Sequence, residues 1–153
     1  MCHNCSASFV LSPDSTRCDP CAAGKFGASP GVCTNCTAGR YEDSKGSLGC
    51  KSCARGQSQE QRGQIECSPC VKGTFANTTL LDQCYDCPKG YFMEYPGSAS
   101  CFSCSPGKFA PVPNSSKCED CPRGYLQDQP KKSFCDKVKA GQVVAEGGSA
   151  SIQ

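Results

Sequence analysis

Apolar side chains along this chain are sparse and never form a long run. The longest apolar stretches are three residues, such as Phe9–Leu11, and no 3.6-residue periodicity survives between the Gly, Pro and polar breakers. A helix is therefore not expected. One apolar residue, usually aromatic, instead returns in each short polar segment, which predicts β-strands of three to five residues around that position, joined by loops.

A single short motif repeats through the chain and carries these apolar positions. Its steps are 16, 15 and then 17 residues six times, and it reads CxxCxxGx[FY] followed by about eight polar residues. Gly stands three residues after the second Cys in seven repeats, and Ser8 replaces it in the first. The CxxC pairs are Cys2/Cys5, Cys18/Cys21, Cys33/Cys36, Cys50/Cys53, Cys67/Cys70, Cys84/Cys87, Cys101/Cys104 and Cys118/Cys121, and a single Cys135 follows.

Composition indicates what must stabilise these repeats. The chain has 17 Cys in 153 residues, about 11%, but only 21 Leu, Ile, Val and Phe together and no Trp. An ordinary hydrophobic core cannot offset the entropy of folding such a chain, so disulfides must contribute. We expect a small disulfide-rich fold, an elongated rod of ~17-residue repeats with short β-strands and little or no helix.

Two disulfide schemes compete: the second Cys of one repeat to the first of the next, or first to first and second to second. Continuing the repeat past Cys135 places apolar Val138 and Ile152 at the next two cysteine positions, 14 residues apart like Cys121 and Cys135. Their joint loss favours the first scheme. It leaves Cys2 unpaired and gives Cys5–Cys18, Cys21–Cys33, Cys36–Cys50, Cys53–Cys67, Cys70–Cys84, Cys87–Cys101, Cys104–Cys118 and Cys121–Cys135.

The repeat phase also divides the chain. We expect a truncated first repeat at 1–17, tandem repeats at 18–135, and a degenerate repeat leading into a following region at 136–153. The first residues form no secretory signal and no run of about 18 apolar residues occurs, so we expect a fragment of a longer extracellular protein whose signal peptide and any anchor lie elsewhere.

The repeat resembles a known family of extracellular modules. The segment from Cys70 through Gly73 and Phe75 to Cys84 resembles the ephrin-receptor-like cysteine-rich repeat, and it is similar to tumour necrosis factor receptor-like and EGF-like repeats. The resemblance implies a non-enzymatic segment of a receptor or adhesion ectodomain, at the cell surface or outside the cell. It carries over no ligand-binding residue, because the even 17-residue spacing departs from the receptor-type domain.

The sequence offers little evidence for metal binding or catalysis. The strongest alternative is an intracellular zinc-binding scaffold whose sites hold each metal ion with four cysteine thiolates, although the repeat Gly stands third after the Cys and not first. Thiol redox catalysis lacks a βαβ context. His3 is the only histidine, and the carboxylate pairs Glu42/Asp43 and Glu119/Asp120 are interpreted as solvated loop charges. We therefore predict no catalytic residue, no metal site and no cofactor.

The sequence invites one modification, N-glycosylation. Asn77 and Asn114 begin acceptor triplets in the variable part of the loop, whereas the triplets at Asn4 and Asn35 lie inside CxxC pairs. The net charge of +2 gives no footprint for nucleic acid, and no membrane contact by this segment is expected. We expect a protein or glycan ligand, contacted by loop tips such as 95–97 and 111–113.

Overall fold

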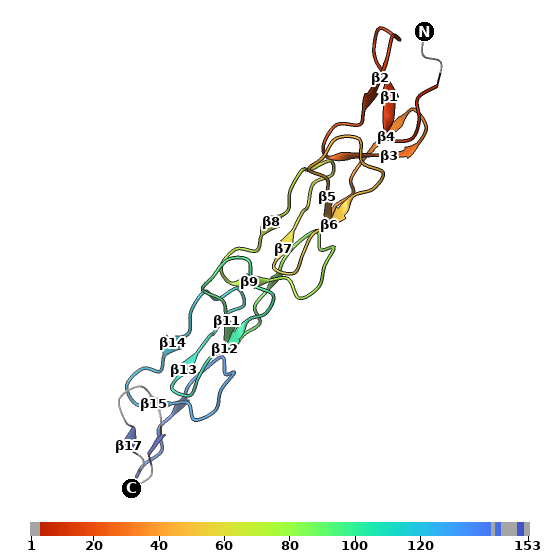
Figure 1. The fold of residues 1–153 in the computed structure, drawn as a ribbon. Coiled ribbons are helices and arrows are strands. Elements are labelled where there is room, and N and C mark those ends of the chain that lie inside the picture. The colour runs from red at the N-terminus through yellow and green to blue at the C-terminus, as the bar shows by residue number, and fades with distance from the viewer. Residues whose placement is uncertain (1–3, 142, 145–149, 152–153) are drawn as a thin grey trace. The chain divides into compact units, whose positions relative to one another are not determined.

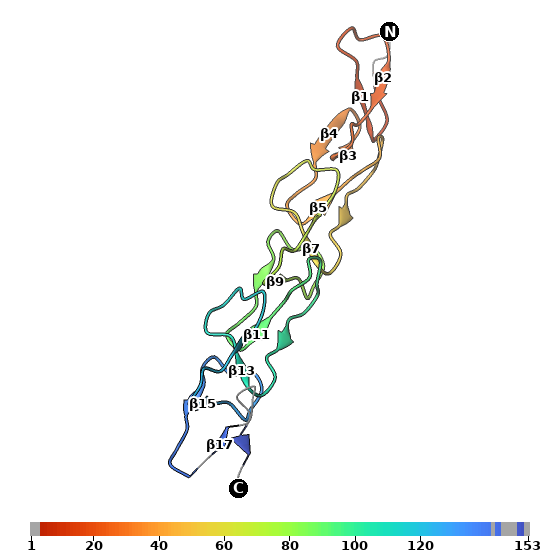
Figure 2. The same cartoon turned by 90° about the vertical axis from the view of Figure 1, so that its left-hand side faces the viewer.

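The computed structural model describes residues 4–141, 143–144 and 150–151. Within them the chain forms short β-strands and no helix, and consecutive strands pair as antiparallel two-stranded hairpins (Figures 1 and 2). The strands are β1 (Phe9–Leu11), β2 (Cys18–Pro20), β3 (Lys25–Ser29), β4 (Val32–Asn35), β5 (Arg40–Tyr41), β6 (Lys51–Ser52), β7 (Gln57–Ser58), β8 (Ser68–Pro69), β9 (Thr74–Phe75), β10 (Tyr85–Asp86), β11 (Tyr91–Phe92), β12 (Phe102–Ser103), β13 (Lys108–Phe109), β14 (Glu119–Asp120), β15 (Tyr125–Leu126), β16 (Asp136–Lys137), β17 (Val143–Val144) and β18 (Ala150–Ser151). The expected fold of short strands without helix is confirmed.

Most strands are two residues long, shorter than the three to five expected from the sequence. The reason is visible in the hydrogen bonds. In β9 the ladder to β10 stops after Phe75, and the next amide, that of Ala76, donates to the carbonyl of Ser98 in the following repeat at 3.0 Å. The backbone thus leaves its own hairpin to bind its neighbour.

Seven of the hairpins are closed by a disulfide that joins the second Cys of one repeat to the first Cys of the next. The two Cα atoms of each bridge lie 5.5–5.8 Å apart, a normal separation for a cystine. The bridges are Cys5–Cys18, Cys21–Cys33, Cys36–Cys50, Cys53–Cys67, Cys87–Cys101, Cys104–Cys118 and Cys121–Cys135, and Cys70 and Cys84 are disulfide-bonded as well. Cys2 lies outside the described residues.

The core is a series of cystines and one further residue per repeat. The second Cys of the repeat is almost fully buried from Cys5 to Cys104. From the repeat of Cys21 onward, the residue six positions after this Cys is called here the buried position. It is buried in every one of these repeats but that of Gln59, and it is occupied by Gly27, Glu42, Gln59, Ala76, Met93, Ala110 and Gln127. The aromatic just before it is only half-buried.

Backbone hydrogen bonds connect successive repeats. The amide of the repeat Gly donates to the carbonyl at the buried position of the next repeat, as from Gly39 to Gln59 at 2.7 Å and from Gly73 to Met93 at 2.8 Å. A second bond runs backwards from the residue ten positions after the second Cys, called here the turn position. Leu80 donates in this way to the carbonyl of Cys53 at 3.1 Å.

The chain divides into two compact parts. One comprises Met1–Pro69 with Thr78–Cys84, and the other comprises Cys70–Asn77 with Tyr85–Gln153. The contacts between repeats described above lie within one part or the other.

The pattern continues past the last disulfide. The amide of Val138 donates to the carbonyl of Gly124 at 2.9 Å, as the second Cys of a repeat does elsewhere. Val143 then pairs with Ser151, a shorter connection than that between Leu126 and Asp136 in the preceding hairpin. Val138 therefore occupies the cysteine position that the spacing predicts, whereas Ile152 lies outside the described residues.

Candidate functional surface

The outer faces of the hairpins present aromatic pairs. Phe75 on β9 lies opposite Tyr85 on β10, with ring centroids 5.9 Å apart, and Phe92 on β11 lies opposite Phe102 on β12 at 6.0 Å. Tyr85 is 51% exposed and Phe102 is 55% exposed. Aromatic pairs in this tilted geometry stabilise the hairpin and leave apolar ring surface available to a ligand.

The hairpin of β5 and β6 places a lysine opposite the aromatic residue of the motif. Lys51 on β6 lies opposite Tyr41 on β5, and its Nζ is 5.8 Å from the ring centroid, within cation–π distance. Its ammonium also pairs with the carboxylate of Asp43. The hydrogen bond from Lys51 lowers the pKa of Asp43, and the same bond raises the pKa of Lys51.

Glu42 corrects one prediction from the sequence. It was interpreted as a solvated loop charge together with Asp43, but the structure buries it at the position beside the cystine, with 3% of its surface exposed. One carboxylate oxygen accepts a hydrogen bond from the Ser44 amide at 3.0 Å, and Lys51 Nζ lies 3.6 Å from it. The same position is also buried where it holds Gly27, Ala76 or Met93, so its burial follows from its place in the repeat.

Two glutamines occupy the same buried position and make a fuller set of bonds. The Nε2 of Gln127 donates to the carbonyl of Phe134 at 2.8 Å, and its Oε1 accepts from the Gln129 amide at 3.1 Å. Gln59 repeats this arrangement with Glu66 and Gln61. The side chain thus ties the start of the loop to its end inside each of these repeats.

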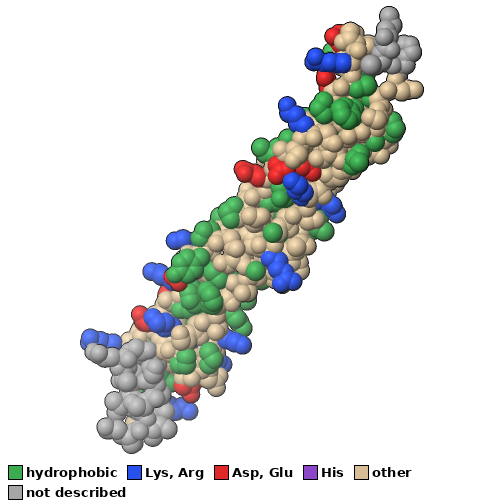
Figure 3. All heavy atoms as spheres, in the orientation of Figure 1, with side chains coloured by type: hydrophobic (Ala, Val, Ile, Leu, Met, Phe, Trp, Pro, Cys, Tyr) green, Lys and Arg blue, Asp and Glu red, His purple; other side chains and the backbone are tan. Residues whose placement is uncertain are grey.

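The remaining charged side chains include both basic and acidic residues. Basic and acidic side chains are interspersed with apolar ones on the face drawn in Figure 3. Glu119 and Asp120 are exposed on strand β14, and Asp120 pairs with Lys108 at 2.6 Å. An exposed pair of this kind contributes little to stability.

The loop tips combine exposed side chains with a fixed backbone. Tyr95 is 60% exposed and Val112 is 57% exposed. The backbone beside them is held, because Gly97 at the turn position donates to the carbonyl of Cys70 at 2.8 Å and Asn114 donates to that of Cys87 at 2.9 Å. A hydrogen bond with Glu94 raises the pKa of the Tyr95 phenol.

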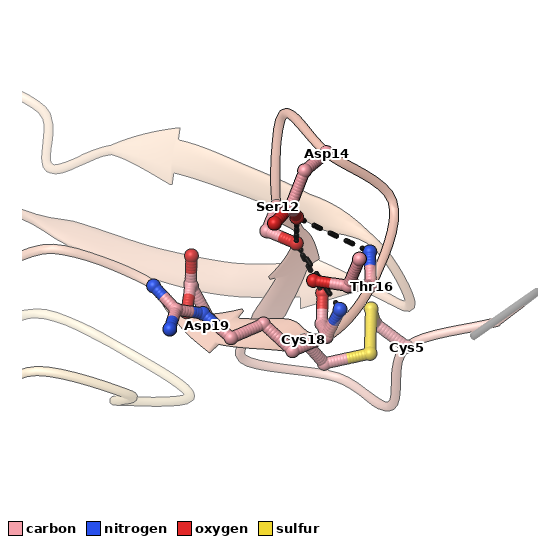
Figure 4. Close-up of polar contacts among 7 residues, drawn as sticks. Cys5, Ser12, Asp14, Thr16, Cys18 and Asp19 are labelled. Atoms are coloured by element: carbon pink, nitrogen blue, oxygen red, sulfur yellow. Dashed lines mark hydrogen bonds and ion pairs between the residues drawn. A yellow bond between two sulfur atoms is a disulfide. The ribbon is translucent and has the colours of Figure 1, made fainter. Parts of the chain in front are cut away.

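The first loop has its own polar closure (Figure 4). In the loop that the Cys5–Cys18 disulfide closes, the hydroxyl of Ser12 donates to a carboxylate oxygen of Asp14 at 2.5 Å. The amide of Thr16 donates to the same oxygen at 3.2 Å. Both bonds lower the pKa of Asp14, and the bond from Ser12 has the larger effect.

The predicted glycosylation sites lie on the surface. Asn77 follows β9 and Asn114 occupies a turn position, and both are exposed, as are Asn4 and Asn35. Asn114 has a left-handed backbone with φ of 61°. His3 lies outside the described residues.

The described residues contain no cluster of three or more His, Cys, Asp or Glu side chains placed to hold a metal ion. The sixteen cysteines from Cys5 to Cys135 are disulfide-bonded, so the thiolates that a zinc scaffold requires are not available. Within the same residues, no helix could cross a membrane.

Sequence reasoning missed the second aromatic of each pair and the turn position. Tyr85 and Phe102 directly follow the first Cys of a CxxC pair, a place where other repeats hold Lys51, Ser68, Glu119 and Asp136. Only the hairpin register could have revealed them, since it sets this residue opposite the aromatic of the motif.

Comparison with known families gives one match. Residues 73–117 match the family described as "Tyrosine-protein kinase ephrin type A/B receptor-like". The matched segment spans the aromatic pairs and the Asn77 and Asn114 sites, and it is less than a third of the chain. The search of curated proteins yields no match.

Proposed function

Because the chain contains an ephrin-receptor-like cysteine-rich region, we propose that it is a non-enzymatic segment of a receptor or adhesion ectodomain. In this role it holds other parts of a longer protein apart and presents its exposed side chains to a protein or glycan ligand. The aromatic pair of Phe92 and Phe102 and the side chains at the loop tips form the contact surface.

The observation that carries this proposal is the hydrogen-bond ladder between repeats. Within each compact part, the carbonyl at the buried position accepts a bond from the preceding repeat Gly, as Gln59 does from Gly39, and the turn position returns one, as Leu80 does to Cys53. Neighbouring repeats are therefore joined by backbone groups as well as by the chain itself. This is the property that a spacer requires, since a flexible linker would bring its two ends together.

The cysteine chemistry supports a location outside the cell. Disulfides of this number form and persist in oxidising compartments, whereas cytosolic thiols are kept reduced. We propose that the chain is secreted or displayed at the cell surface and carries N-linked glycans at Asn77 and Asn114.

Intact mass of the chain tests the compartment and the pairing. The chain is expressed through a secretory pathway and weighed before and after reduction, with free thiols and zinc counted on the same sample. We expect sixteen oxidised cysteines and no zinc. Full thiol mass with bound zinc would overturn both the location and the function.

A second experiment tests the spacer role. Deleting residues 87–103 removes one whole repeat and keeps the CxxC phase, since Cys104 then follows Asp86. Small-angle X-ray scattering of both oxidised chains should show a shorter maximum dimension for the deletion variant. An unchanged dimension, or scattering of a flexible coil in either protein, would refute the spacer role.

A further inference from the structure

The surroundings of Asn77 contain more than an acceptor triplet. Residues 74–77 alternate in burial, with Thr74 and Ala76 buried, Phe75 half-buried and Asn77 exposed. Side chains two residues apart on an extended backbone project from the same face. The alternation places Phe75 and Asn77 on the more exposed side of this segment.

Tyr85 widens this face. It pairs with Phe75 across β9 and β10, its ring lies 5.9 Å from that of Phe75, and half of its surface is exposed. Together the two rings form an apolar surface, and Phe75 stands two residues before Asn77. No hydrogen bond to another described residue holds the Asn77 amide, so it is available for a sugar.

The first sugar of an N-linked glycan matches this surface chemically. One face of N-acetylglucosamine carries only C–H groups, which are apolar and slightly positive, and the face of an aromatic ring is apolar and negative. We propose that Phe75 and Tyr85 form a platform on which the first N-acetylglucosamine attached to Asn77 packs. This inference rests on the proposed glycosylation of Asn77, and it assigns the exposed ring pair to the chain's own glycan.

The chain supplies two internal comparisons. The pair Phe92 and Phe102 has the same register and ring separation, but Glu94 stands where Asn77 would be, so it has rings without a sugar. Asn114 has the opposite combination, because Val112 stands two residues before it. A contact between sugar and ring is therefore expected at Asn77 and not at Asn114.

The test uses the full secreted chain with its glycans trimmed by an endoglycosidase to the single innermost sugar. Mass spectrometry first measures the occupancy of Asn77 and Asn114. NMR then compares the chemical shifts of the sugar protons in the two N-acetylglucosamine residues. We expect the sugar on Asn77 to be shifted upfield by the ring currents and to show nuclear Overhauser contacts to Phe75 or Tyr85, while the sugar on Asn114 resembles a free glycopeptide.

Variants separate this contact from folding. Tyr85→Thr removes a half-exposed ring and should reduce the upfield shift while the disulfides form as before, and Phe75→Leu should abolish it. Glu94→Asn with Pro96→Thr moves an acceptor site to the second ring pair and should reproduce the shift there. An unoccupied Asn77, or equal sugar shifts at Asn77 and Asn114, would overturn the proposal. Neither result would alter the scattering and thiol measurements that test the proposed function.

Discussion

Gly39 lies directly against the backbone carbonyl of Leu80, a residue two repeats further along the chain. A Cβ atom built on Gly39 would overlap that oxygen, and Gly39 has φ of 76°, a conformation that only Gly adopts readily. The repeat Gly therefore serves two purposes, a left-handed turn and a close approach by the turn position of a later repeat. The same contact joins Gly24 to Gly63, Gly73 to Asn114 and Gly90 to Lys131.

Replacing this Gly should disrupt the stacking of repeats. We expect Gly39→Ala to lower the free energy of unfolding by about 2–4 kcal/mol, because it adds left-handed strain to an overpacked contact. Denaturant unfolding of the oxidised chain measures the effect.

Two glycines in the same compact part serve as controls for this substitution. Gly31 has φ of 73° with no atom near its Cβ position, so Gly31→Ala should show the backbone cost alone, about 1 kcal/mol. Gly49 has neither feature, and Gly49→Ala should change stability by no more than about 0.5 kcal/mol. Equal effects at Gly39 and Gly31 would show that the contact with Leu80 does not contribute.

Leu80, the partner of Gly39 in this contact, adopts a backbone conformation that Gly would adopt with less strain than Ala. Leu80 has φ of 67° although it is not Gly, and its side chain is 44% exposed. We expect Leu80→Gly to be more stable than Leu80→Ala by up to about 1 kcal/mol, because relief of left-handed strain exceeds the extra flexibility of Gly in the unfolded chain. Thermal unfolding of the two variants compares them directly. A less stable Leu80→Gly variant would show that the turn position is not strained.

The repeat motif predicts the local structure well because its residues are constrained everywhere. Cysteine spacing and a Gly at one place in seven repeats indicate the hairpin, its closure and the lack of helix. The turn position is only partly evident from the sequence. Gly31, Gly46, Gly63 and Gly97 occupy it and indicate a left-handed residue, whereas Ser15, Leu80 and Lys131 adopt positive φ there although their residue types do not favour it. Leu80 and Lys131 contact other repeats through their backbone, and such contacts leave no local signal in the sequence.

The candidate surface was predictable only in part. The aromatic of the motif is evident from the sequence, but its partners Tyr85 and Phe102 depend on hairpin register. Burial of Glu42 was missed for a similar reason. The buried position accepts Gly, Ala, Met, Gln and Glu, because backbone bonds to two neighbours hold it whatever the side chain.

The pairing of Asp43 with Lys51 should make the stability of the chain depend on pH at both ends of the scale. The Asp43 pKa is lowered from 3.8, so its contribution to stability is present above that pH and is lost as the pH falls through the folded-state pKa. The Lys51 pKa is raised from 10.5, so its contribution is present below that pH and is lost as the pH rises through the folded-state pKa.

NMR titration of the Asp43 carboxyl carbon tests this pair. In Lys51→Met the Asp43 pKa should rise toward 3.8, whereas in Lys108→Met, which breaks the separate pair with Asp120, it should stay as in the parent chain. An Asp43 pKa unchanged by Lys51→Met would mean that the two groups do not interact in solution.

The buried position allows a reciprocal exchange of Glu and Gln. Gln127 donates to the carbonyl of Phe134 through its amide nitrogen, but a carboxylate at Glu42 has no proton to give to the corresponding carbonyl, that of Gly49. We therefore expect Glu42→Gln to raise the free energy of unfolding by about 0.5–1.5 kcal/mol, the net value of one hydrogen bond. The loss of its 3.6 Å pairing with Lys51 offsets only part of this gain, since Lys51 keeps Asp43.

The reverse substitution should have the opposite and larger effect. Gln127→Glu places a carboxylate against the Phe134 carbonyl in a side-chain site with 1% exposure, and we expect it to cost about 1–3 kcal/mol. Gln127→Met, which fills the site as Met93 does in its own repeat, separates the lost bond from the added charge. Guanidinium unfolding of the oxidised variants measures all three. A stabilising Gln127→Glu, or a Glu42→Gln variant less stable than the parent, would show that the loop is not closed through this side chain.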